Sequence, residues 1–219
     1  MRSAAAGAVL GLALAVGVPA TWVLTRPPAA AGPSAEQVLA APTAGRGTAT
    51  PAPGTPPSVT TRDAAPPSSG TVPVPVLVSV PALGVSAPVD PVGVDPEGRM
   101  ELPADVDRVG WYRFGPVPGG GGSAVLAGHV DDREQGLGVL APLRRAAVGD
   151  EVLVTDSTGT AGRWRIVSRE LIEKRALPQD ALFRRDGPPR LVLVTCGGPF
   201  VPESGSYRDN VVVVAEPVR

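Results

Sequence analysis

From residue 74 onward the chain is a succession of short runs of β-branched and apolar residues, and this pattern restricts the fold more than any other feature. Gly, Pro and Asp bound these runs, as they commonly bound β-strands. The runs are residues 74–80, 86–92, 123–128, 151–155, 162–171, 190–195 and 210–215. Helical signals are confined to residues 139–147 and 178–183. Short strands at close spacing predict a mainly all-β fold that closes, or nearly closes, into a barrel.

The N-terminal segment indicates the compartment. Residues 4–24 form a stretch of 21 residues without a charge. A helix of that length spans roughly 30 Å, the thickness of the hydrocarbon core of a bilayer. A cleavable signal peptide is the alternative, because Ala29-Ala30-Ala31 could supply a cleavage site, but its apolar core is shorter, about 7–15 residues. We therefore expect residues 1–26 to be a single-pass transmembrane anchor in the cell membrane, with the rest of the chain extracytoplasmic.

The next segment has the composition of a spacer. Residues 27–71 are rich in Pro, Ala, Thr, Gly and Ser, which bury too little apolar area to offset the ordering of the chain. Residues 36–41 offer a helical turn that nothing in the neighbouring sequence sustains. We expect residues 27–71 to be a disordered linker, followed by one folded domain of residues 72–219, long enough for its own core.

Charge and cysteine content exclude several classes of function. The formal net charge is −1, so nothing in the overall balance indicates nucleic acid as a partner. The chain has one cysteine, which excludes an intramolecular disulfide framework and a multi-cysteine metal site.

The one histidine and the one cysteine each follow an apolar run, so we expect both at strand ends. His129 ends Ser-Ala-Val-Leu-Ala-Gly-His, and Cys196 ends Leu-Val-Leu-Val-Thr-Cys. Arg208 stands just before a third run, Val-Val-Val-Val. The thiolate is the reactive form of cysteine, and a neighbouring imidazole can supply it. A guanidinium stays charged and can hold a developing oxyanion.

Neighbouring residues can support such a site. Thr195 would offer its hydroxyl and backbone groups to the same pocket. Gly197 and Gly198 would let a substrate backbone approach closely. Asp131, two residues after the histidine, would either orient the imidazole or cap a loop, and the sequence leaves both interpretations open.

These segments resemble those of sortases, the cysteine transpeptidases of Gram-positive surfaces. They read Leu-Ala-Gly-His129-Val-Asp131, Leu-Val-Leu-Val-Thr195-Cys196-Gly-Gly and Tyr-Arg208-Asp-Asn-Val-Val-Val. Their order along the chain is that of the family, and so is an N-terminal anchor followed by a spacer. The residues around the histidine and the cysteine look most like class F, or the related class E, of high-GC actinobacteria.

The resemblance implies a sortase-like barrel of about eight strands and a covalent mechanism. Cys196 would cleave a Leu-Pro-x-Thr-Gly-like (LPXTG-like) sorting signal between Thr and Gly, with His129 protonating the leaving amine and Arg208 holding the oxyanion. An amine of a peptidoglycan precursor, or water, would then accept the acyl group. No cofactor is expected. No acidic cluster marks the calcium site of some class A members, so no metal is expected either.

Two other functions remain as alternatives. One is another cell-wall cysteine peptidase or hydrolase, but L,D-transpeptidases place the histidine beside the cysteine, whereas His129 lies 67 residues before Cys196. The other is a non-catalytic wall-associated β module in which Cys196 is a buried core residue. The reactivity of the thiol distinguishes this last case from the enzymes.

Overall fold

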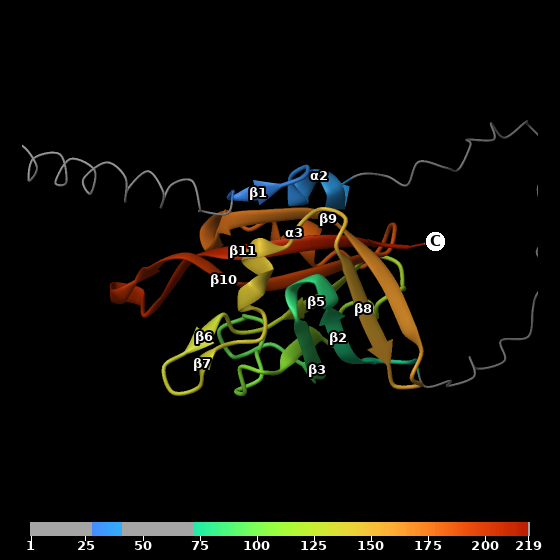
Figure 1. The fold of residues 1–219 in the computed structure, drawn as a ribbon, viewed down its shortest axis with the longest axis horizontal. Helices are drawn as coiled ribbons and strands as arrows, with labels where there is room; N and C mark the ends of the chain where they lie inside the picture. The colour runs from blue at the N-terminus through green and yellow to red at the C-terminus, as the bar shows by residue number, and fades with distance from the viewer. Residues whose placement is uncertain (1–27, 41–71, 219) are drawn as a thin grey trace, which may run out of the picture.

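The computed structural model describes residues 28–40 and 72–218 (Figure 1). The predicted anchor, residues 1–26, and most of the predicted linker therefore lie outside the described residues. Among the helices of residues 28–40 and 72–218, none has the length and apolar character needed to cross a membrane.

Eight strands close into a barrel, which confirms the predicted fold class. Their order is β9-β11-β10-β5-β4-β3-β2-β8, and β8 pairs again with β9. The pairs β3–β4 and β5–β10 are parallel and the others are antiparallel. The barrel strands are β2 (Pro75–Val80), β3 (Val85–Val92), β4 (Val109–Tyr112), β5 (Ser123–Ala127), β8 (Glu151–Asp156), β9 (Ala161–Glu173), β10 (Arg190–Val201) and β11 (Ser206–Pro217).

Short elements connect these strands. A small hairpin of β6 (Asp131–Asp132) and β7 (Gly136–Leu137) follows β5. The helices between barrel strands are η1 (Pro81–Leu83), η2 (Ala141–Arg145), η3 (Lys174–Ala176), α3 (Gln179–Leu182) and η4 (Pro202–Ser204). The predicted helix over residues 139–147 is thus a short 3-10 helix, η2, with a proline in its first turn.

Every predicted strand run forms a strand, and within the barrel β4 is an additional strand that the sequence analysis did not identify. Two strands are longer than their apolar runs. β10 continues beyond Thr195 to Val201, and β11 begins at Ser206, so the two form a long hairpin with a bulge between Gly197 and Phe200. Cys196 therefore lies inside β10, whereas we expected it at the end of a strand.

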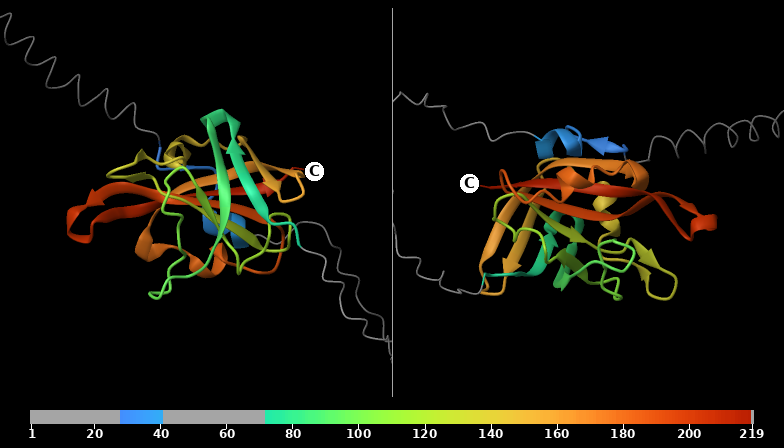
Figure 2. Two further views of the ribbon diagram at one scale, coloured as in Figure 1. Left: turned by 90° about the horizontal axis from the view of Figure 1, so that it is seen from below. Right: turned by 180° about the vertical axis from the view of Figure 1, so that it is seen from behind.

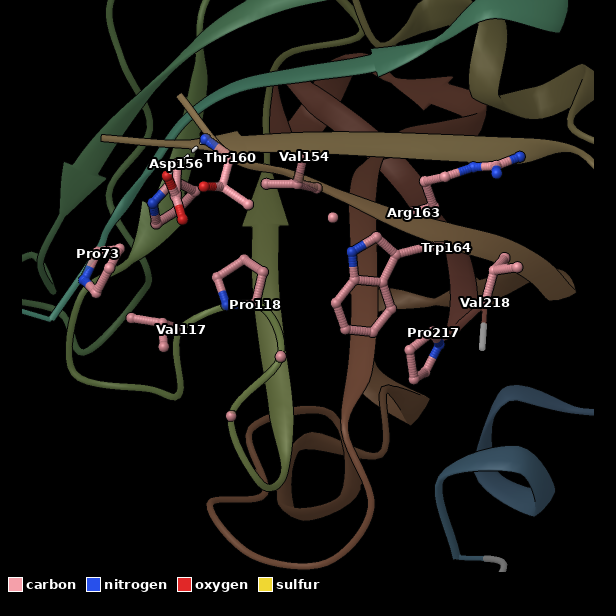
Figure 3. A pocket seen from close by; sticks show the side chains of 14 residues that line it. Pro73, Val117, Pro118, Val154, Asp156, Thr160, Arg163, Trp164, Pro217 and Val218 are labelled. Carbon is pink, nitrogen blue, oxygen red and sulfur yellow. Dashed lines mark hydrogen bonds between the residues drawn. The ribbon is translucent and has the colours of Figure 1, made fainter. Parts of the chain in front are cut away.

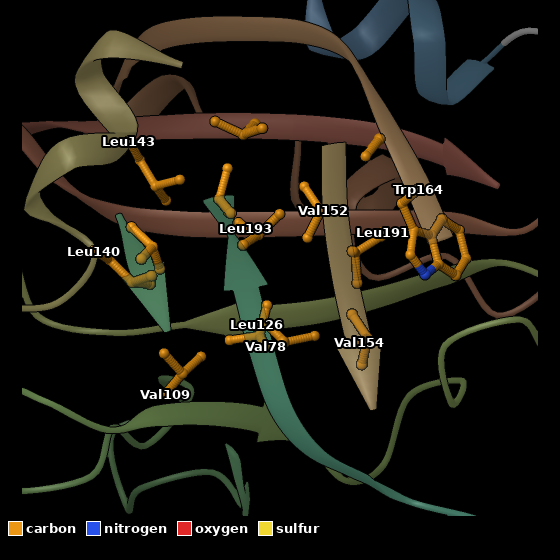
Figure 4. Packing of buried hydrophobic residues seen from close by; sticks show 14 of the residues in the cluster. Val78, Val109, Leu126, Leu140, Leu143, Val152, Val154, Trp164, Leu191 and Leu193 are labelled. Carbon is orange, nitrogen blue, oxygen red and sulfur yellow. The ribbon is translucent and has the colours of Figure 1, made fainter. Parts of the chain in front are cut away.

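The core follows the alternation of side chains along the strands. In β10, Leu191 and Leu193 point into the barrel, where they pack with Val213 of β11 and Trp164 of β9 (Figure 4). The intervening Val192 points outward into a second apolar cluster. Burial of such a leucine or valine stabilises the fold by about 1.5–3 kcal/mol. Apolar packing on both faces of the β10–β11 pair therefore holds the hairpin in place.

The N-terminal part of the predicted linker is folded, contrary to our expectation. β1 (Ala30–Ala31) pairs with β9, and α2 (Ala35–Ala40) lies over the outer face of β9 and β11 (Figure 2). Here α2 buries three apolar residues, Ala35, Val38 and Leu39, in the outer cluster. The packing of these apolar residues against the barrel thus stabilises a helical turn that the local sequence alone would not sustain.

The start of α2 is also capped. The backbone N–H of Gln37 donates to Oγ of Ser34 at 3.2 Å, and the backbone N–H of Ser34 donates to Oε1 of Gln37 at 3.2 Å. This reciprocal pair is a capping box, which satisfies N–H groups that have no partner within the helix. Residues 28–40 therefore belong to the folded unit.

Candidate active site

The parallel pairing of β5 with β10 brings the histidine and cysteine segments to the same end of the barrel. The last pair in register is Ala127 with Val194. Beyond it, the backbone N–H of Gly128 donates to the carbonyl of Val194 at 3.1 Å. His129 and Cys196 each follow two residues after that last pair, so the sole imidazole and the sole thiol are on adjacent chain segments.

Thr195 locks these two segments together. Its side chain is buried, and its hydroxyl donates to the carbonyl of Gly128 at 2.8 Å. The sequence analysis expected this hydroxyl to face a substrate pocket. The structure instead uses it to hold the backbone next to His129.

Arg208 reaches the same end of the barrel from β11. In the β10–β11 register Cys196 is opposite Asn210, and Gly197 is opposite Asp209. The guanidinium of Arg208 donates to both carboxylate oxygens of Asp209, at 2.7 and 3.0 Å. These hydrogen bonds to the carboxylate raise the pKa of Arg208 above its usual range. The Asp209 side chain is 3% exposed and that of Arg208 is 54% exposed, so a buried carboxylate holds a guanidinium that faces solvent.

The two glycines after the cysteine make room for the protein's own side chains. A Cβ at Gly198 would lie 2.1 Å from Oδ2 of Asp209, and φ is +73° there. A Cβ at Gly197 would lie 2.8 Å from Val211. We expected these glycines to admit a substrate backbone. In the structure they let Asp209 and Val211 pack against β10.

Asp131 is bound by a tyrosine. The hydroxyl of Tyr207 donates to Oδ2 of Asp131, which connects β11 to the β6–β7 hairpin. This bond raises the pKa of Tyr207, because the neutral phenol is the form that donates to the carboxylate. Among the described residues, no hydrogen bond joins Asp131 to His129, so Asp131 fits a role in fixing the loop.

An open cavity of about 910 Å³ lies where these segments meet. Cys196, Arg208, Asp131 and Tyr207 line it together. Cys196 is partly exposed rather than buried. His129 is also partly exposed but does not line the cavity; its chain neighbours Val130 and Asp131 do. We call this hollow the Cys196 cavity.

The Cys196 cavity has walls that the sequence analysis missed. Pro28 and Ala29, from the segment next to β1, line it, and so do three arginines, Arg144, Arg145 and Arg169. The capping sequence Ser34-x-x-Gln37 followed by apolar residues was a local signal that the N-terminal segment is ordered. The arginines gave no such signal, because they are far from the motifs in the sequence.

A second cavity of about 560 Å³ lies at the opposite end of the barrel, where β11 ends (Figure 3). It is lined by Trp164, by several prolines and glycines, and by polar groups such as Asp156 and Arg163. Neither the histidine nor the cysteine reaches it. The Cys196 cavity is therefore the candidate active site. Within residues 28–40 and 72–218, no group of three or more His, Cys, Asp or Glu side chains could hold a metal ion.

Comparison with known families agrees with this geometry. A family model described as the sortase domain matches residues 78–218, which is more than half of the chain. The chain belongs to the sortase family. It is accordingly a cysteine transpeptidase, the activity that defines this family.

Solved sortases have the same fold. Sortase C1 from Streptococcus suis aligns with a TM-score of 0.51 at 17% identity, covering 67% of this chain and 74% of that one. Sortase A from Corynebacterium diphtheriae aligns with a TM-score of 0.50 at 17% identity, covering 67% of this chain and 61% of that one. At such identities the likeness establishes the fold alone. No curated protein matches the chain.

Proposed function

We propose that this sortase cleaves an LPXTG-like sorting signal between Thr and Gly and transfers the acyl group to an amine of a cell-wall precursor. Cys196 is the nucleophile, His129 the acid–base group, and Arg208 the group that stabilises the oxyanion. The observation that carries these roles is the Cys196 cavity, in which the sole thiol and Arg208 share one hollow beside the segment that carries the sole imidazole.

In the proposed acylation step, Cys196, Arg208 and His129 each have one role. The thiolate of Cys196 bonds to the carbonyl carbon of Thr, and the carbonyl oxygen becomes an oxyanion that the guanidinium of Arg208 stabilises. Collapse breaks the Thr–Gly C–N bond, and the imidazolium of His129 gives its proton to the leaving amine. The product is a thioester on Cys196.

Deacylation reverses these roles. The acceptor amine attacks the thioester carbonyl, and the neutral imidazole of His129 takes the proton of the amine. The C–S bond breaks and Cys196 leaves as a thiolate. Water in place of the amine would give hydrolysis, so the balance between transfer and hydrolysis depends on how well the cavity binds the acceptor.

We further propose that residues 1–26 anchor the protein in the cell membrane, with residues 41–71 as a spacer and the barrel outside the cytoplasm. The support is the uncharged stretch of residues 4–24 and the proline-rich composition that follows the folded residues 28–40. The residues around His129 and Cys196 favour class F or class E within the family.

Product analysis tests the proposal. The full-length chain in detergent is incubated with Leu-Pro-x-Thr-Gly peptides, with x varied, and with an amine such as triglycine. We expect a peptide joined to the amine at Thr, and loss of this product in Cys196→Ala and His129→Ala. Arg165→Ala, which removes an exposed side chain outside the cavity, should retain the wild-type rate. Turnover that persists in Cys196→Ala, or cleavage at another bond, would refute the proposed mechanism.

A further inference from the structure

The charges that line the Cys196 cavity are unbalanced. Four arginines line it, whereas Asp131 is the one carboxylate among the described residues that line it. Arginine stays protonated at any physiological pH. The four arginines are Arg144, Arg145, Arg169 and Arg208.

Part of this charge is neutralised within the protein. Arg208 pairs with Asp209, and the carboxylate of Asp131 accepts the hydroxyl of Tyr207. Arg144 and Arg145, which are exposed at the end of η2, form no ion pair with any residue in 28–40 or 72–218. The η2 side of the cavity therefore has a net positive charge.

Arg169 adds a buried positive charge to the same cavity. It is 5% exposed, its Nε donates to the carbonyl of Ala146 at 2.8 Å, and its Nη1 donates to the carbonyl of Pro28 at 2.8 Å. Both acceptors are neutral, so they satisfy hydrogen bonds without compensating the charge. Buried charges are normally paired, and desolvation makes an unpaired one costly.

The same two hydrogen bonds give this wall a fixed geometry. Ala146 directly follows η2, and Pro28 directly precedes the segment that leads to β1. Arg169 on β9 therefore ties η2 and the N-terminal segment to the barrel beneath the cavity. Arg144 and Arg145 thus extend from an element that is held in place.

We propose that Arg144, Arg145 and Arg169 form an anion-binding wall that recognises a carboxylate group on a substrate of the acyl transfer. Guanidinium groups bind carboxylates through paired, charge-assisted hydrogen bonds. The anion belongs either to the acyl donor, as an acidic residue of the sorting signal, or to the amine acceptor. The assignment of the anion to a substrate rests on the proposed function. The positive charge of the wall follows from its arginines and does not depend on that function.

Alkylation of the single cysteine tests the charge of the wall without any turnover. Iodoacetate and iodoacetamide both add to a thiolate with loss of iodide, and they differ by one negative charge. We measure the rate of alkylation of Cys196 by iodoacetate divided by its rate of alkylation by iodoacetamide, in the full-length chain. In the double variant Arg144→Gln/Arg145→Gln this ratio should fall by about three- to ten-fold, because the cavity no longer attracts the anion.

Arg165→Gln is the matched control, since it removes an exposed arginine of β9 that does not line the cavity. It should leave the ratio of the two rates unchanged. Both variants change surface residues, so neither depends on replacing the buried Arg169. An unchanged ratio in the double variant, or an equal fall in the control, would overturn the anion-binding wall.

Two substrate pairs then identify the source of the anion. The acceptor pair is triglycine and triglycinamide, and the donor pair is Leu-Pro-Glu-Thr-Gly and Leu-Pro-Gln-Thr-Gly. For one pair, the double variant should raise the KM of the anionic member about ten-fold, as expected for the loss of charge-assisted hydrogen bonds. The KM of the neutral member should stay unchanged.

The outcomes separate this proposal from the proposed function. If neutral peptides and amines react through Cys196 but neither pair shows a charge preference, the anionic substrate is refuted and the sorting reaction stands. If no peptide reacts but the alkylation ratio falls in the double variant, the sorting signal is refuted and the wall stands as an anion site.

Discussion

At the scale of single residues, the site depends on side chains that are held by partners rather than on the motif residues alone. Asp209 holds Arg208, Tyr207 holds Asp131, and Thr195 holds the backbone before His129. Each of these bonds fixes a group at the Cys196 cavity or next to it. The chemistry of the cavity should therefore be sensitive to partners that never touch the substrate.

Asp209→Asn tests this dependence. The amide keeps one acceptor oxygen and presents an N–H₂ group to the guanidinium, so Arg208 loses its paired contact. If Arg208 acts on the oxyanion, kcat should fall about 10- to 100-fold while KM changes little, because the affected interaction forms in the transition state. Steady-state kinetics with a sorting peptide and triglycine measure both constants.

Asp186→Asn is the control for that substitution, since Asp186 also accepts a hydrogen bond from a nearby arginine, Arg184, but lies outside the cavity. It should leave kcat unchanged. An unaltered kcat in Asp209→Asn would mean that the Arg208–Asp209 pair does not serve the reaction.

At the scale of elements, the N-terminal segment is part of the domain and of the site. α2 covers the outer face of β9 and β11, and Pro28 and Ala29 line the Cys196 cavity. The position of α2 thus connects the packing of the outer cluster to the shape of the cavity. Loosening α2 should affect both stability and substrate binding.

Leu39→Ala measures this connection. Leu39 is 3% exposed in the outer cluster, so its truncation should destabilise the fold by about 2–3 kcal/mol, at the low end for buried leucines because the helix is short and superficial. KM for the peptide should rise as the cavity wall loosens. Chemical denaturation and kinetics of the full-length chain measure these effects.

Leu137→Ala is the control for stability, since Leu137 is 71% exposed. It should show a much smaller loss of stability than Leu39→Ala. Equal losses in the two variants would contradict the packing of α2.

The parallel pair β3–β4 is held by an ion pair whose effect depends on pH. Arg108, just before β4, donates to both carboxylate oxygens of Asp90 in β3, and these hydrogen bonds hold the pKa of Asp90 below its usual range. A lowered pKa in the folded state stabilises the fold above the unfolded-state pKa, near 3.9. That contribution is lost as the pH falls through the folded-state pKa.

Asp90→Asn should therefore destabilise the protein at pH 7 and not at low pH. The pair is more than one third exposed, so the expected loss at pH 7 is about 0.5–1 kcal/mol. Thermal unfolding at pH 7 and near pH 2 gives the comparison, with Asp107→Asn, an exposed neighbour, as the control. A difference between wild type and Asp90→Asn that persists unchanged near pH 2 would contradict the ion-pair explanation.

At the scale of the whole molecule, the sequence predicted what depends on local pattern and missed what depends on distant partners. The strand runs and the barrel followed from alternation and turn residues. β4 was missed because Gly110 interrupts a strand of four residues, and the continuation of β10 past Cys196 depends on pairing with β11. The docking of residues 28–40 depends on an apolar face of β9 and β11 that the local composition does not reveal.

The candidate site shows the same division. His129, Cys196 and Arg208 were predicted as site residues from their positions beside apolar runs, and the structure places the three segments at one end of the barrel. The roles of Tyr207 and Asp209, and the arginines of the cavity wall, follow from contacts between elements that are distant in the sequence. No local pattern could have supplied those contacts.

The most direct test of the account is to trap the covalent intermediate on Cys196. The full-length chain is mixed with Leu-Pro-x-Thr-Gly peptides without an added amine, quenched in acid, and analysed by intact and peptide-level mass spectrometry. We predict an added mass equal to the free peptide acid ending at Thr less one water, as a thioester requires, located on Cys196 and absent from Cys196→Ala. Cleavage of the Thr–Gly bond by Cys196→Ala at the wild-type rate, or an acyl group on any other residue, would contradict the account.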